Sequence, residues 1–266
     1  VITSQSVQGI YHSKSEAGDY WKLETQSDQY IGSKLVLATG SNPKMWDLIS
    51  NFGHNIINPV PSLFTFNIKD KRIKDLPGVA TRATVEVKNT KLTSSGPLLI
   101  THWGMSGPAI LKLSAWGARI LEEKNYQFQI VVNWLDDIDL ESFVIQLKKW
   151  KQEHSKKSIS KKAPFDFPNR LWESLVLAAG VEEETKWADL SNKQMQDLAL
   201  QFTKCEFQVN GKSTFKEEFV TAGGIDLKEI NFKTMESKLH PSLYFVGEIM
   251  NIDAITGGFN FQNAWT

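Results

Sequence analysis

The strongest chemical pattern in the chain lies in the segment from Leu243 to Trp265. A short apolar run over residues 243–246, bounded by Pro241 and Gly247, is typical of a buried strand. Glu248 follows this run, so its carboxylate is expected at the carboxyl end of the strand. An ionised carboxylate there could accept hydrogen bonds from the hydroxyl groups of a bound ligand. The competing interpretation is a surface glutamate after a strand.

A pair of glycines after this strand is expected to lead into a helix that begins near Asn260. Gly257 and Gly258 have no Cβ atoms, so their backbone can approach a flat ring closely. Backbone N–H groups and the helix dipole would then favour negative charge, which a flavin gains on reduction, by about 3 kcal/mol per donor. We expect these glycines, Phe259 and Asn260 to hold an isoalloxazine ring. An ordinary strand–turn–helix, with Phe259 in the core, is an alternative of similar weight.

A second pattern, Thr101-His-Trp-Gly-Met-Ser-Gly-Pro108, joins an expected strand to an expected helix. It predicts that His102 ends the strand and that Ser106 lies near the helix cap, so both side chains would face one volume. A proton donor beside a flavin is what hydride addition to an enone or imine requires. The competing interpretation is that His102 only fixes the turn.

These segments belong to a set whose joint order resembles a known family. The chain is similar to the FAD-dependent oxidoreductases of the two-dinucleotide-binding-domain superfamily, in the group that includes aminoacetone oxidase and the bile-acid 3-oxo-Δ4 reductases. The similarity covers the whole chain. Besides the two patterns above, the motifs that carry it are Leu35-Val-Leu-Ala-Thr-Gly40, Gly53-His54, Pro59-Val-Pro-Ser-Leu63, Val220-Thr-Ala-Gly-Gly-Ile225, Glu229-Ile230 and Thr234-Met-Glu-Ser-Lys238.

The resemblance implies an FAD cofactor and further residues that hold it. The turn at Gly40 would pass close to the diphosphate or ribityl chain, where a larger side chain would collide with the cofactor. Relatives usually have an aspartate where Asn251 stands, so a contact at that position would be neutral here. The full expected cofactor-binding set is Thr39, Gly40, Gly223, Gly224, Gly247, Glu248, Asp253, Gly257, Gly258, Phe259 and Asn260.

We therefore expect a flavin-dependent oxidoreductase that acts on a small organic substrate by hydride transfer through the isoalloxazine, with His102 and Ser106 as catalytic residues. NAD(P)H or oxygen would exchange electrons with the flavin. NAD(P)H would bind transiently, because no motif for a separate nicotinamide-binding domain is present.

The alternative is a non-catalytic binding module. Residues 148–162 carry seven lysines and one acid around Trp150, a composition that could dock a protein or a nucleic acid. A solvated helix end is the more common interpretation of such a run.

Composition limits the remaining classes. The chain has 266 residues, 41% of them apolar, and a formal net charge of zero, so no global field attracts nucleic acid or an anionic membrane. Cys205 is the single cysteine, which excludes an intramolecular disulfide and a cysteine-based metal cage and fits the cytoplasm. No segment has the pattern of a membrane span or a signal peptide. The sequence indicates no particular oligomeric state.

Strand-rich and helix-rich stretches alternate along the chain. Residues 1–40 favour a β-meander. The later strands are expected over residues 34–38, 62–68, 80–87, 98–102, 128–134, 205–209, 215–221 and 243–246. One helix is expected over 109–121 with Pro108 in its first turn, and residues 139–202 have helical spacing, with Asp189-Leu-Ser191 offering a cap for the last helix.

The expected fold class is α/β: a partial Rossmann-like FAD-binding domain interrupted by a β-barrel-like module that carries an all-α subdomain. The FAD-binding domain would comprise residues 1–58 and 223–266, the β-rich insert residues 59–138 and 203–222, and the helical subdomain residues 139–202. We also expect the chain to be a piece of a longer protein, because it starts at Val1, stops in the first turn of a helix and contains no G-x-G-x-x-G after a strand.

Overall fold

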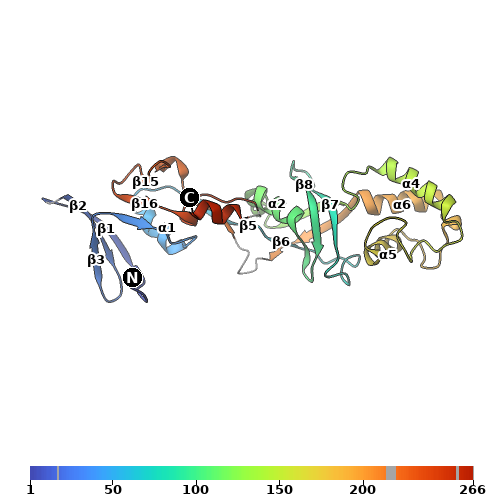
Figure 1. The fold of residues 1–266 in the computed structure, drawn as a ribbon, viewed down its shortest axis with the longest axis horizontal. Helices are drawn as coiled ribbons and strands as arrows, with labels where there is room; N and C mark the ends of the chain where they lie inside the picture. Colours follow the sequence, from blue (N-terminus) through green and yellow to red (C-terminus); the bar gives the residue numbers. More distant parts are fainter. Residues whose placement is uncertain (17, 214–219, 256–257, 266) are drawn as a thin grey trace. The chain divides into compact units, whose positions relative to one another are not determined.

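The computed structural model describes residues 1–16, 18–213, 220–255 and 258–265, and Figure 1 shows its elements. The chain divides into two units. Unit 1 contains residues 1–60 and 221–266, and unit 2 contains residues 61–220. Each unit has its own cluster of buried apolar side chains.

Unit 1 begins with a three-stranded antiparallel sheet in the order β1-β2-β3. Its strands are β1 (Gly9–Ser15), β2 (Gly18–Glu24) and β3 (Gln29–Gly32), in the part of the chain where alternating residues predict a meander. The side chain of Trp21 on β2 is buried in the core of unit 1.

A second sheet of unit 1 has the order β14-β15-β16-β4. Its strands are β4 (Leu35–Leu37), β14 (Ile230–Asn231), β15 (Glu236–Ser237) and β16 (Leu243–Phe245). β16 pairs with β4 in parallel, with Leu243 opposite Leu35 and Phe245 opposite Leu37. These four side chains are buried, so the apolar run expected over 243–246 is confirmed as a strand.

Short helices and one further ladder complete unit 1. The helices are α1 (Pro43–Ser50), α7 (Phe259–Trp265) and the 3₁₀ turns η2 (Leu227–Glu229) and η3 (Gly247–Ile249). α7 begins one residue before the helix start expected at Asn260. β5 (Ile56–Ser62) and β13 (Val220–Ile225) form a two-stranded sheet, most of which belongs to unit 1.

The centre of unit 2 is a seven-stranded sheet in the order β11-β10-β7-β8-β9-β6-β12. Its strands are β6 (Thr65–Asn67), β7 (Ala80–Val87), β8 (Thr93–Ile100), β9 (Gly104–Ser106), β10 (Gln127–Asn133), β11 (Cys205–Asn210) and β12 (Lys212–Ser213). Neighbouring strands pair antiparallel. The strand expected over 215–221 lies mostly outside the described residues.

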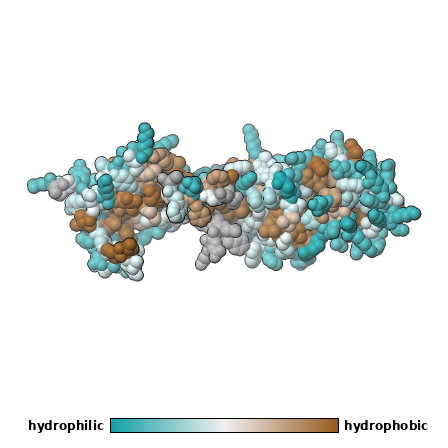
Figure 2. All heavy atoms as spheres, viewed as in Figure 1, coloured by the Kyte–Doolittle hydropathy of each residue, from teal (hydrophilic) through white to brown (hydrophobic). Residues whose placement is uncertain are grey.

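Helices and strands of unit 2 share one hydrophobic core, which joins Phe143, Leu171 and Phe202 on helices to Val85 and Ile130 on strands. The helices are α2 (Pro108–Trp116), α3 (Ala118–Glu123), α4 (Leu140–Glu153), α5 (Asn169–Ala178), α6 (Asn192–Thr203) and the 3₁₀ turn η1 (Trp187–Asp189). On the face drawn in Figure 2, hydrophilic side chains cover most of the helical end of this unit.

Local capping follows the sequence closely at one helix and differs at another. The cap expected within Asp189-Leu-Ser191 is confirmed: Ser191 caps α6, and it forms a reciprocal capping box with Gln194. The single helix expected over 109–121 is wrong, because α2 ends and α3 begins at Gly117. A Cβ atom at this position would lie 2.6 Å from Leu92 Cδ1 and 2.9 Å from the carbonyl oxygen of Leu113, so only glycine fits the break.

Within the described ranges, none of the helices combines the length and the apolar character that crossing a bilayer requires.

Two glycines of unit 2 allow the cost of a strained backbone to be compared with the cost of steric overlap. Gly104 has a φ of 148°, and a Cβ atom there would overlap the carbonyl oxygen of Phe66 across the β6–β9 ladder. Gly78 has a φ of 88° but no atom within 4 Å of its Cβ position. We expect Gly78→Ala to lower the free energy of unfolding by about 1–2 kcal/mol and Gly104→Ala to lower it by at least ~3 kcal/mol. Urea denaturation measures both values, and equal losses would contradict the overlap.

Candidate functional site

The candidate site in unit 1 starts at one edge of the parallel strand pair. Because β4 and β16 run in the same direction and Val246 N donates to Leu37 O at 3.1 Å, the segments that follow them leave the sheet at the same edge. These segments are Thr39-Gly40 and Gly247-Glu248, which are partly buried or exposed. In open α/β sheets, this edge is where ligands bind. The structure therefore brings together four of the residues expected to hold a cofactor.

A buried hydrogen bond fixes the backbone at this edge. Trp46 lies on α1, and the Asn42 side chain caps the first turn of this helix. The indole Nε1 of Trp46 donates to the carbonyl oxygen of Ile249 at 2.8 Å. Ile249 is the last residue of η3, the turn that contains Gly247 and Glu248. The indole thus joins the helix after β4 to the turn after β16.

Gly223 and Gly224 allow close packing of backbone on backbone. A Cβ atom on Gly223 would lie 2.5 Å from Pro59 Cα in the neighbouring strand, and one on Gly224 would lie 2.5 Å from the carbonyl oxygen of Ile249. Asn251 N donates to Ile225 O at 3.0 Å, so β13 also ends beside η3. This packing accounts for both glycines, and their contact with a cofactor stays a prediction.

The segment before α7 is held by the side chain of Asn260. Its Oδ1 accepts from Ala254 N at 2.8 Å and its Nδ2 donates to Ala254 O at 2.9 Å. Asp253 in this segment is partly buried, whereas Phe259 exposes 54% of its surface. Gly257 lies outside the described residues.

Two glycines at this site have open space beside them. Gly40 has a φ of 62° and Gly258 a φ of 85°, and no atom lies within 4 Å of the Cβ position of either residue. At Gly247, a Cβ would make only ordinary contact with Ala264 Cβ of α7, at 3.9 Å. A backbone with positive φ and free volume beside it fits the close approach of a flat group. The residues present are therefore compatible with a flavin.

A buried polar network in unit 1 joins His54 to residues of two other motifs, and no pattern in the sequence predicts it. His54 is 3% exposed, and its Nδ1 lies 2.7 Å from Glu229 Oε2 while its Nε2 lies 3.0 Å from Ser237 Oγ. Burial lowers the pKa of His54 below its ordinary value of 6.5, and this outweighs the Glu229 carboxylate, which acts in the opposite direction. The motif containing His54 and the two containing its partners were visible separately, but nothing local joins them.

The order serine–histidine–glutamate resembles that of a nucleophilic triad. Ser237 Oγ, however, accepts from Leu239 N at 3.0 Å and from His240 N at 2.9 Å. With both acceptor positions filled, the hydroxyl donates to His54 Nε2, and the Nδ1 proton is then directed at Glu229. The serine is buried as well, so the network stabilises the turn and does not supply a nucleophile.

His102 and Ser106 lie in unit 2, and the structure does not bring them together. β8 ends at Ile100, so His102 is an exposed residue of the β8–β9 turn. Ser106 lies at the other end of β9, where its Oγ accepts from Thr65 Oγ1 at 3.1 Å. Ser106 lies next to the cap of α2, as expected: Gly107 is the N-cap residue, with a φ of 90° and a Cβ position only 3.0 Å from neighbouring backbone atoms.

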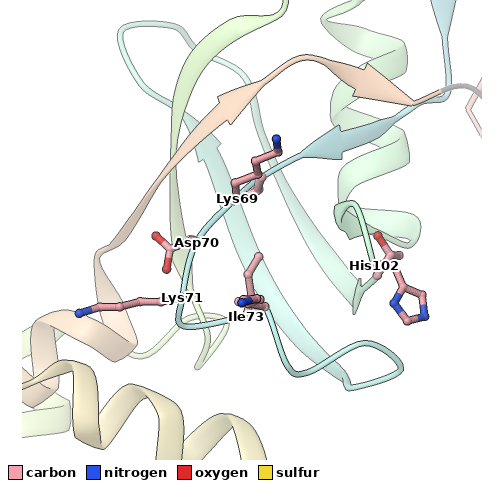
Figure 3. A pocket seen from close by; sticks show the side chains of 8 residues that line it. Lys69, Asp70, Lys71, Ile73 and His102 are labelled. Atoms are coloured by element: carbon pink, nitrogen blue, oxygen red, sulfur yellow. The ribbon is translucent and has the colours of Figure 1, made fainter.

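His102 borders a cavity of about 380 Å³, shown in Figure 3. The side chains of Lys69, Lys71 and His102 point in different directions around it. The cavity is lined by Ile68, Lys69, Asp70, Lys71, Ile73, Lys74, Thr101 and His102.

The described residues support neither cysteine-based nucleophilic chemistry nor a metal site. Burial raises the pKa of the Cys205 thiol to about 11, so this cysteine is a poor nucleophile at neutral pH. No group of three or more histidine, cysteine, aspartate or glutamate side chains in the described part of the chain is arranged to hold a metal ion.

Residues 60–220 match a family model described as "HI0933-like protein barrel and H2TH domain". This range coincides with unit 2 to within one residue.

Curated relatives match both units. The chain is 31% identical over 244 residues to the "Ribosomal RNA dihydrouridine synthase" of Escherichia coli, which covers 88% of this chain and 58% of that protein. It is 30% identical over 279 residues to the protein of the same name from Haemophilus influenzae, covering 100% of this chain and 66% of that protein. A "3-dehydro-bile acid delta(4,6)-reductase" from Clostridium scindens is 25% identical over 241 residues, covering 88% of this chain and 58% of that protein. The chain thus spans 58% to 66% of the length of these relatives.

The buried histidine predicts a pH-dependent stability. Because the pKa of His54 is lowered in the folded state, the unfolded chain binds a proton below about pH 6.5 that the folded chain does not, so the free energy of unfolding falls as the pH decreases. In His54→Asn this contribution should disappear. Loss of the imidazole contacts should also lower the unfolding free energy by about 2–3 kcal/mol at neutral pH.

Urea denaturation on either side of pH 6.5 measures this effect. His102→Asn is the control, because its exposed side chain makes no hydrogen bond among the described residues. An unchanged pH dependence in His54→Asn would contradict the assignment.

Proposed function

The chain belongs to the HI0933-like family, and from this premise we propose that the full-length protein is a flavin-dependent oxidoreductase that reduces uridine in ribosomal RNA. The names of its relatives support one reaction class. Formation of dihydrouridine saturates the C5=C6 bond of uracil, which is conjugated to the C4 carbonyl. The name of the bile-acid enzyme likewise describes reduction of carbon–carbon double bonds next to a 3-oxo group. Both are hydride additions to a double bond activated by a carbonyl.

The observation that carries the flavin part is the shared edge of β4 and β16. When bound, FAD would supply the hydride for uracil C6, while a proton is added at C5. The chain's own part is to hold that cofactor: the turns at Gly40 and Gly258 leave room for it, and Glu248 can accept hydrogen bonds from ribityl hydroxyls. His102 and Ser106 stay proposed catalytic residues, and NAD(P)H stays a proposed electron donor.

RNA replaces the small organic substrate expected from the sequence. That expectation rested on the resemblance to enzymes of small molecules and on the zero net charge. Two relatives carry a ribosomal RNA substrate in their names, which favours RNA as the substrate here.

Full-length protein tests both parts. We expect it to purify with a flavin absorption spectrum that bleaches under anaerobic reduction. The reduced protein should add two hydrogens to a uridine in unmodified ribosomal RNA transcripts, detected by mass spectrometry of nucleosides. Absence of flavin would overturn the whole proposal. A flavoprotein that turns over with NAD(P)H but leaves every uridine intact would overturn the RNA substrate alone.

The indole bond at the site yields a quantitative prediction. Trp46→Phe removes the donor to Ile249 O while keeping an aromatic side chain, so the turn containing Gly247 and Glu248 should be less ordered before flavin binds. A hydrogen bond of about 0.5–1.5 kcal/mol corresponds to a rise in the flavin dissociation constant of about 2- to 13-fold.

The matched control is Trp172→Phe. It removes an equally buried indole donor, to Ile159 O at 2.7 Å, but from unit 2. Fluorescence titration of apoprotein with FAD measures both variants. An equal loss of affinity in the two would show that the bond at η3 has no particular role.

A further inference from the structure

We propose that a cationic hollow in unit 2 binds the phosphodiester backbone of the RNA substrate. The hollow is the cavity of about 380 Å³ between the segment after β6, residues 68–74, and the β8–β9 turn, residues 101–103. This inference rests on the proposed function, since it names the surface that would hold the RNA.

The charges of this segment are not balanced. Residues 69–74 read Lys-Asp-Lys-Arg-Ile-Lys, with four cations and one acid. Arg72 neutralises that acid, because its Nε and Nη2 donate to Asp70 Oδ1 and Oδ2 at 2.9 and 2.8 Å. Lys69, Lys71 and Lys74 are exposed, and their ammonium groups make no ion pair or hydrogen bond within the described ranges. Three lysines without an ion pair therefore line one hollow, and of these Lys71 also interacts electrostatically with Asp70.

The segment that carries these lysines is firmly held. The Arg72 guanidinium also donates to Gln201 Oε1 at 3.0 Å and to the carbonyl oxygen of Glu206, and it lies 4.2 Å from the centre of the Phe207 ring. Ile73 is 2% exposed and packs into the core. Little backbone ordering is left for a ligand to impose, which favours binding.

The arrangement of the cations fits an extended polyanion better than a single small anion. In Figure 3, the side chains of Lys69 and Lys71 diverge around the hollow. Ammonium groups that converge would hold one phosphate, whereas diverging groups can meet successive phosphates of a strand.

An exposed aromatic side chain beside the lysines favours RNA over an acidic protein. Trp103 follows His102 in the β8–β9 turn and exposes 58% of its surface. Its carbonyl oxygen accepts from Ile68 N at 2.9 Å, which places the turn directly beside the cationic segment. Stacking of unpaired bases on aromatic rings next to a basic groove is the usual mode of single-stranded RNA binding.

The lysine run over 148–162 is the weaker candidate for this role. Lys149 pairs with Glu153 at 3.8 Å, Lys161 pairs with Glu184 at 3.1 Å, and Lys151 Nζ donates to Leu190 O at 2.6 Å. Three of its seven lysines thus have partners within unit 2. The others offer a matched set of exposed charges for comparison.

The test uses full-length holoprotein and an unmodified ribosomal RNA transcript as the probe. The variant K69Q/K71Q/K74Q removes the three charges of the hollow, and K148Q/K156Q/K162Q removes three exposed charges from the run. We expect the first to bind about 10- to 100-fold more weakly and to reduce the slope of log K against log salt by about 2. The second should bind like the wild type. Flavin content and anaerobic reduction should be unchanged in both.

A third variant separates stacking from charge. Trp103→Leu should weaken RNA binding by about 5- to 100-fold with the salt slope unchanged, since stacking involves no counterion release.

The outcomes distinguish this inference from the proposed function. If wild-type flavoprotein binds and reduces the RNA while K69Q/K71Q/K74Q keeps its affinity and salt slope, only the hollow is overturned. An equal loss in the control variant would likewise overturn it. If the wild-type flavoprotein does not bind the transcript, both ideas fail. If polyglutamate competes as strongly as RNA and Trp103→Leu has no effect, the hollow serves an acidic protein instead.

Discussion

The structure of unit 1 depends on the parallel pairing of β4 with β16, two short strands from distant parts of the chain. The pairing places two glycine-containing turns at one edge of the sheet. The backbone that follows is fixed by the buried hydrogen bond from Trp46 to Ile249 and by the two hydrogen bonds between the Asn260 side chain and Ala254. Without the strand pair the bond from Trp46 to Ile249 would have no frame, because it joins segments that the sequence separates.

Features that depend on neighbouring residues could be predicted, and features that depend on distant partners could not. The strand at 243–245 and the Ser191 cap follow from local pattern. His54 and Glu229 are 175 residues apart, so no local pattern indicates that they meet. At Gly117 a Cβ atom would overlap the side chain of Leu92, a contact that no local pattern indicates. Thus the elements could be predicted from the sequence, whereas the separation of His102 from Ser106 by β9 could not.

Net charge and local charge lead to different conclusions for this chain. The formal net charge of zero argues against a polyanionic partner. Interactions between exposed charges are screened over about 8–10 Å at physiological ionic strength, so a partner responds to the surface near it. Around residues 69–74 that surface is positive, because one arginine has already neutralised the only acid of the segment. Composition could exclude a global field but not a local one.

The ladder between β5 and β13 lies where the chain enters and leaves unit 2. Gly223 lets these strands lie backbone against backbone, so the polypeptide departs toward residue 61 and comes back at residue 220 through adjacent positions. The entropic cost of bringing the two ends of an inserted segment together grows only with the logarithm of its length. Lengthening unit 2 therefore adds little to this cost. Unit 2 can therefore be regarded as an insertion whose length and loops can differ among relatives while the pairing of β5 with β13 is kept.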